Sequence, residues 1–148
     1  MTIAVDFDGT IVEHVYPKIG KEVPFAFEVL KKLQAEGHTL LLWTVRNADL
    51  LDEAVDYCKK NGLVFYAVNQ NFPEENKGEY SRKITADLYI DDRNIGGLPD
   101  WGLIYRMIKS DTNDLGKIDH FMDEYKPKKK NFFTRLGEAI DRQSGRGY

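Results

Sequence analysis

The chain has 148 residues, which suits one domain and is long enough to bury a hydrophobic core. Its 42% hydrophobic and 30% charged content is typical of a soluble globular protein, and a net charge of −3 disfavours a protein that coats nucleic acid with its whole surface. The single cysteine, Cys58, excludes an internal disulfide. Without a bilayer-length apolar run or a signal-peptide pattern, we expect a soluble, cytoplasmic protein with no membrane partner.

Apolar runs alternate with helical patterns up to about residue 110. In chain order the pattern predicts a strand at 3–7, a helix at 24–36, a strand at 39–45, a helix at 49–61, strands at 63–68 and 88–90, and a helix at 101–109. Pro24 suits the first turn of its helix, Gly37 suits the stop, and Asp100 can cap the last helix. This alternation predicts an α/β fold, a three-layer Rossmann-like parallel sheet with helices on both faces.

Residues 111–148 differ in character from the domain predicted at 1–110. They contain the basic run 126–130 (KPKKK), two phenylalanines, and then Leu136 and Ile140 at helical spacing. One interpretation is a charged linker and a terminal helix that packs on the domain or frays. The other is a basic patch flanked by aromatic residues that binds nucleic acid or another anionic surface.

Polar side chains follow three of the predicted strands at the point where each strand ends. In chain order these are Asp6, Asp8, Thr44, Arg46, Asp91 and Asp92. Because the carboxyl ends of parallel strands lie at the same edge of a sheet, and ligands bind just outside it, we expect these residues to converge on one site.

Such a cluster of carboxylates suits a divalent metal and an anionic substrate. Two acids at one strand end repel each other unless a cation lies between them, and Mg²⁺ prefers oxygen ligands. With Mg²⁺ present, one carboxylate can attack a phosphate while a second acid protonates the leaving oxygen and then activates water. A hydroxyl such as Thr44 and a cation such as Lys83 can hold the remaining phosphate oxygens.

The order of these residues resembles the four motifs of the haloacid dehalogenase superfamily of phosphohydrolases. The resemblance covers residues 1–95 approximately: DFDGT after the first strand, Thr44 after the second, a downstream lysine, and Asp91–Asp92 after the fourth. It implies that Asp6 is the nucleophile that forms an aspartyl-phosphate and that Asp8 is the general acid/base. The acid at position 8 argues against a dehalogenase, because that branch of the superfamily lacks it.

The resemblance also implies the metal and phosphate ligands. Mg²⁺ would be held by Asp6, the backbone carbonyl of Asp8, Asp91 and Asp92. The expected phosphate- and substrate-binding residues are Gly9, Thr44, Arg46 and Lys83. For Arg46, a surface ion pair is the alternative.

The identity of the phosphate-site lysine stays open. Residues 86–93 (ADLYIDDR) are similar to the corresponding stretch of 5′(3′)-deoxyribonucleotidases, whose lysine lies slightly further upstream than Lys83. Lys77 is therefore the alternative, and Arg82 is a third.

The windows in which members of the superfamily carry a cap domain hold only about 15 residues each, too few for a separate core. We therefore expect an open site on a Mg²⁺-dependent phosphomonoester hydrolase. Its cover would come from a large substrate, from a neighbouring subunit in a homo-oligomer, or from residues 111–148. A nucleotidase or polynucleotide end-phosphatase is one alternative, and a non-catalytic metal- and phosphate-binding regulatory module is another.

Overall fold

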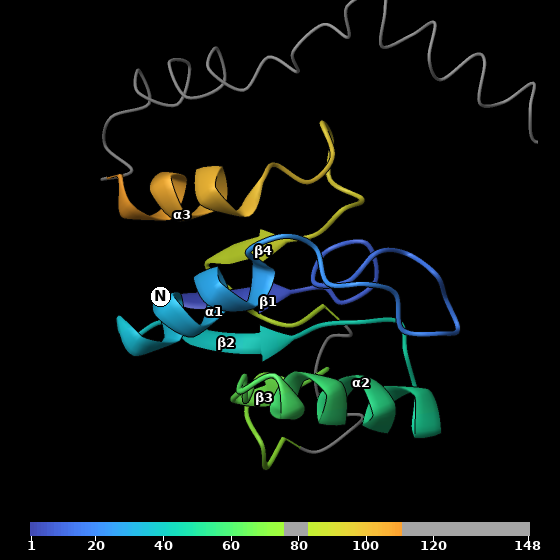
Figure 1. Cartoon of the computed structure of the whole chain (residues 1–148). Coiled ribbons are helices and arrows are strands. Elements are labelled where there is room, and N and C mark those ends of the chain that lie inside the picture. Colours follow the sequence, from blue (N-terminus) through green and yellow to red (C-terminus); the bar gives the residue numbers. More distant parts are fainter. Residues whose placement is uncertain (76–82, 111–148) are drawn as a thin grey trace, which may run out of the picture. The chain divides into compact units, whose positions relative to one another are not determined.

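Four strands form one parallel sheet in the order β3–β2–β1–β4 (Figure 1). They are β1 (Thr2–Val5), β2 (Thr39–Leu42), β3 (Ala67–Val68) and β4 (Leu88–Ile90). The computed structural model describes residues 1–75 and 83–110, so the segment predicted at 111–148, together with Lys77 and Arg82, lies outside the described residues. The predicted α/β class and the all-parallel sheet are confirmed, and the arrangement is consistent with a Rossmann-like fold.

The two central strands are buried on both faces. On β1, Ile3 and Val5 contribute to one hydrophobic cluster and Ala4 to the other, and Leu42 and Leu41 of β2 divide in the same way. All five side chains are at most 1% exposed. This explains why both segments are apolar without the alternation of a half-exposed strand.

The helices of the described residues are α1 (Ala26–Ala35), α2 (Ala48–Lys60) and α3 (Trp101–Lys109). Each contributes buried side chains to the same cluster, represented by Leu30, Ala54 and Trp101. Right-handed crossovers that run in one direction along a sheet place their helices on one face, as happens from β1 to β2 and from β2 to β3.

The prediction of helices on both faces is not met within the described residues. The connection from β3 to β4 runs back across the sheet, and its described parts, 69–75 and 83–87, contain no helix. From this connection Ile84 packs against Ala4 and Leu41, with Ala86 partly buried beside them. The second face is therefore covered here by irregular chain.

Several predicted element ends shift for local reasons. Helix α1 begins at Ala26 because residues 23–26 form a turn, in which the Ala26 N–H donates to the Val23 carbonyl at 3.1 Å and Phe25 has a φ of 67°. Gly37, with a φ of 87°, follows the end of α1 as predicted. The Asp100 carboxylate accepts from the Leu103 N–H at 2.9 Å, so the predicted cap of α3 is confirmed.

Strands β2 and β3 are shorter than the apolar runs that predicted them. The run 39–45 ends as a strand at Leu42, and the run 63–68 forms a strand only at Ala67–Val68. Among the described helices, none is long and apolar enough to cross a membrane.

Leu42→Ala should lower the free energy of unfolding by about 2–5 kcal/mol, because it leaves a cavity beneath the central strands. Urea unfolding followed by circular dichroism measures the change. The matched control is Val64→Ala, since Val64 is 58% exposed and its truncation should change stability by no more than about 0.5 kcal/mol. Equal losses in both variants would contradict this account of the core.

Candidate functional site

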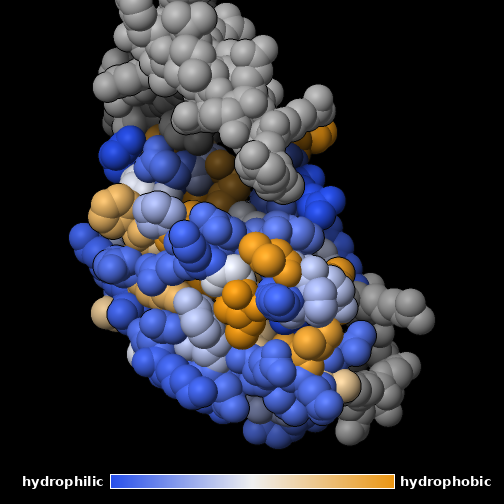
Figure 2. Space-filling model, turned by 45° about the vertical axis from the view of Figure 1, so that its right-hand side comes forward, coloured by the Kyte–Doolittle hydropathy of each residue, from blue (hydrophilic) through white to orange (hydrophobic). Residues whose placement is uncertain are grey.

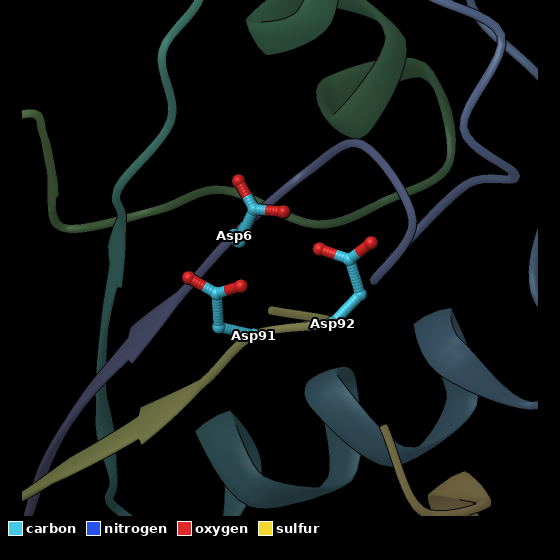
Figure 3. Close-up of side chains that lie close together, drawn as sticks. All are labelled: Asp6, Asp91 and Asp92. Atoms are coloured by element: carbon cyan, nitrogen blue, oxygen red, sulfur yellow. The ribbon is translucent and has the colours of Figure 1, made fainter. Parts of the chain in front are cut away.

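Three carboxylates from neighbouring strands come together at the carboxyl edge of the sheet (Figure 3). Asp6, Asp91 and Asp92 each offer an oxygen, and these oxygens lie within 4.8 Å of one another. The cause is strand register: Val5 is paired with Ile90, and the Asp6 N–H donates to the Ile90 carbonyl at 3.0 Å. The residues that follow the two strands are therefore neighbours.

Thr10 links the two halves of this cluster. Its hydroxyl donates to the Asp6 carboxylate at 3.2 Å and accepts from the Asp92 N–H at 3.1 Å. Its carbonyl accepts from the Trp101 indole N–H at 3.2 Å, and Thr10 is fully buried. Sequence reasoning assigned Thr10 no role, although the residue is the last letter of the DFDGT run.

Gly9 makes room for the cluster. Its φ is 92°, and a Cβ at this position would lie 2.3 Å from an Asp92 carboxylate oxygen, so any larger residue would displace that carboxylate. Its N–H donates to the Val12 carbonyl at 2.7 Å. The expected phosphate contact of Gly9 therefore finds no support in this geometry, because its backbone donor is already used.

Burial and like charge act on Asp6. Burial, reinforced by the negative charges of Asp91 and Asp92, raises the pKa of Asp6 to about 7, against hydrogen bonds from Phe7 and Thr10 that lower it. The Nε atom of Arg93 lies 3.5 Å from a carboxylate oxygen of Asp92, but the Arg93 side chain is largely exposed. Three hard oxygen ligands with so little compensating charge fit a divalent cation.

Asp8 is not part of this cluster. Both oxygens of its buried carboxylate accept from Arg46, one from Nε and one from Nη2, each at 2.7 Å. Its backbone carbonyl, the expected metal contact, lies 3.3 Å from His14 Nδ1. The structure thus separates Asp8 from the three other acids that the sequence grouped with it.

Arg46 is a buried side chain that donates hydrogen bonds to protein oxygens. It is 1% exposed, and beyond Asp8 it donates to the backbone carbonyls of Pro17 at 3.0 Å and Lys18 at 3.1 Å. The ion pair with Asp8 raises the pKa of Arg46. In this structure Arg46 forms an ion pair, which was the alternative, but a buried one rather than a surface one; the substrate contact of Arg46 stays a prediction.

Thr44 lies at the same edge, directly beyond β2. Its N–H donates to the side-chain oxygen of Asn69 at 2.8 Å, and its hydroxyl accepts from the Arg46 N–H at 3.3 Å. Asn69, with a φ of 53°, follows β3 as the acids follow β1 and β4. A search for polar residues after all four strands would have found it.

Lys83 precedes β4, and its ammonium lies 4.9 Å from the centre of the Tyr89 ring. The rival candidates, Lys77 and Arg82, lie outside the described residues. The phosphate-site lysine therefore stays a prediction.

The edge that carries the acids also carries exposed apolar side chains. Large hydrophobic residues are exposed on the segments that follow each strand, at Val15, Tyr16, Val45, Phe72 and Ile95. Figure 2 shows hydrophobic side chains among hydrophilic ones on the side of the molecule turned forward. Within the described residues, these side chains are not buried by another element.

A solved structure of a conserved protein from Bacteroides thetaiotaomicron is similar to this chain, with a TM-score of 0.71 and 66% sequence identity. The match covers 74% of this chain and 89% of the Bacteroides chain. No protein-family model matches the sequence, and no curated protein matches it.

Asp6→Asn should stabilise the metal-free protein increasingly as the pH rises. The pKa of Asp6 is about 7 in the folded state, against an ordinary value of 3.8. Between pH 3.8 and pH 7 the folded protein therefore keeps a proton on Asp6 that the unfolded chain has lost. The free energy of unfolding of the wild type thus falls as the pH rises through this range. Asparagine does not ionise, so the stability gain of Asp6→Asn should grow from pH 4 to pH 7 and level off above it. Urea unfolding in EDTA at a series of pH values measures this gain. A stability difference between Asp6→Asn and wild type that does not change with pH would contradict the prediction.

Mg²⁺ should raise the melting temperature of the wild-type protein, because a ligand that binds only the folded state stabilises it by about 2.7 kcal/mol at a hundredfold excess over Kd. Asp92→Asn should abolish most of this shift, since it removes one of the three carboxylates. Asp56→Asn on the exposed face of α2 should keep the shift. The melting temperature of each protein is measured without Mg²⁺ and at Mg²⁺ concentrations raised in roughly tenfold steps. An equal shift in all three proteins would exclude the three carboxylates as the metal site.

Proposed function

The chain belongs to the same family as the conserved Bacteroides thetaiotaomicron protein, and we propose that it is a Mg²⁺-dependent phosphomonoester hydrolase of the capless haloacid dehalogenase type. One observation carries the proposal: Asp6, Asp91 and Asp92 offer oxygens within 4.8 Å of one another at the carboxyl edge of a parallel sheet. Ligands of α/β proteins bind at this edge, and such a cluster suits a metal with an anionic substrate.

Asp6 is the proposed nucleophile. Thr10 donates to one of its oxygens at 3.2 Å, which orients the carboxylate and leaves the other oxygen for attack on phosphorus. The attack breaks the bond between phosphorus and the leaving oxygen and forms an aspartyl-phosphate; water then attacks the phosphorus and restores the Asp6 carboxylate. Mg²⁺, held by Asp6, Asp91 and Asp92, would supply the positive charge that lets two anions approach each other.

Asp8 is the proposed general acid/base, which gives a proton to the leaving oxygen and takes one from the attacking water. Both of its oxygens accept hydrogen bonds from Arg46. Asp8 therefore has to give up one of these hydrogen bonds and take up a proton from solvent before it can pass that proton to the leaving oxygen. The hydroxyl of Thr44, at the same edge, is the proposed phosphate ligand, together with Lys83 or Lys77.

A second candidate function is a regulatory module that binds a metal and a phosphate without hydrolysis. The observation that favours it is the pairing of Asp8, because an acid whose two oxygens are both occupied by Arg46 performs no proton transfer unless it moves.

The test is hydrolysis of p-nitrophenyl phosphate by the purified full-length chain, with Mg²⁺ and with EDTA. Turnover should need the metal, and Asp6→Asn should lower kcat by at least about 1,000-fold, because it removes the nucleophile. Exposed Asp56→Asn is the matched control and should keep wild-type kcat.

Full activity of Asp6→Asn would sink the aspartyl-phosphate mechanism. Saturable binding of Mg²⁺ and orthophosphate without turnover, over a panel that includes mononucleotides and oligonucleotide 5′- and 3′-phosphates, would favour the regulatory module.

A further inference from the structure

A buried arginine, Arg46, joins the Asp8 carboxylate to the backbone of the segment that follows the DFDGT run. Arg46 is 1% exposed and Asp8 is 4% exposed. The guanidinium carbon of Arg46 lies 5.1 Å from the centre of the Phe7 ring and 5.4 Å from the centre of the exposed Tyr16 ring. Removing a charged side chain from water costs free energy, which hydrogen-bonded partners in good geometry must offset. The partners of Arg46 therefore show what its burial achieves.

The segment that Arg46 contacts is residues 13–21, here called the strap. Its base is a narrow antiparallel pairing, in which the Glu13 N–H donates to the Lys21 carbonyl at 2.7 Å and the Val23 N–H donates to the Ile11 carbonyl at 2.9 Å. Further out, the strap is exposed at Tyr16. There the backbone carbonyls of Pro17 and Lys18 accept from Arg46.

We propose that Arg46 is a positioning residue, which holds Asp8 in one orientation and ties the strap to the carboxyl edge of the sheet. Through Arg46, the position of the strap and the orientation of Asp8 are coupled. This inference rests on the proposed function only for the role of Asp8 in catalysis; the attachment of the strap is independent of it.

The chemistry of arginine explains why this residue stands at position 46. Its planar guanidinium donates two parallel hydrogen bonds to one carboxylate and still has donors that point elsewhere. Arg46 uses them for Asp8 on one side and for Pro17 and Lys18 on the other. Lysine carries the same charge at a single point, so it cannot bind both partners in this geometry.

Hydrogen exchange of the amides of Glu13 and Val23 tests the attachment. In the wild type these amides should exchange slowly, and in Arg46→Lys they should exchange at least about tenfold faster, while the amides of β1 keep their rates, because the strap opens locally. Arg106→Lys on the exposed face of α3 is the matched control and should leave both sets unchanged.

Exchange of the wild-type Glu13 and Val23 amides at the rate of an unstructured chain would overturn the proposal, and this measurement needs no variant to fold. Unchanged protection in a folded Arg46→Lys would overturn it as well.

Kinetics distinguish positioning from direct phosphate binding. Arg46→Lys should lower kcat by about 10- to 100-fold, because a misplaced acid costs rate, while the inhibition constant of orthophosphate should stay within about twofold of wild type. A large rise in that constant at unchanged kcat would instead make Arg46 a substrate ligand and overturn the proposal.

If the wild type shows no turnover, the proposed function fails, and the exchange rates still decide whether Arg46 holds the strap. The two failures are therefore separable.

Discussion

The pairing of β1 with β4 is the constraint on which the site depends. Val5 and Ile90 are partners in the parallel register, and the Asp6 N–H extends the ladder by one hydrogen bond to Ile90. A slip of one residue would turn alternate side chains to the opposite face, which would bury an acid in the core and move an apolar residue to the edge. The burial of Ile3 and Val5 on one face and Ala4 on the other prevents that slip.

Around this pair of strands, the site contains a cluster of three carboxylates and, beside it in the sequence, a carboxylate that is paired with an arginine. Asp6, Asp91 and Asp92 repel one another and lack a buried cation among the described residues, which is the electrostatic condition of a metal site. Asp8, two positions from Asp6, has its cation built in as Arg46. Two carboxylates from one strand end thus meet opposite electrostatic environments, a common way for proteins to give chemically similar residues different roles.

Much of the fold and part of the site follow from sequence patterns. Short apolar runs and helical spacing identify every described strand and helix, and the rule that polar residues after parallel strands meet at one edge finds Asp6, Asp91 and Asp92. The same rule does not predict the buried pairing of Arg46 with Asp8, because sequence position alone does not show whether a cation points outward or pairs with a neighbour. The irregular cover of the second face at Ile84 leaves no periodic signal either.

Trp101, the first residue of α3, connects this helix to the acidic edge. Its side chain is buried in the core, and its indole N–H donates to the carbonyl of Thr10, the residue whose hydroxyl contacts both Asp6 and the Asp92 backbone. A shift of α3 would therefore pull on the loop that orients the nucleophile candidate. Substitutions in the interior of this helix can thus alter the site through one tryptophan.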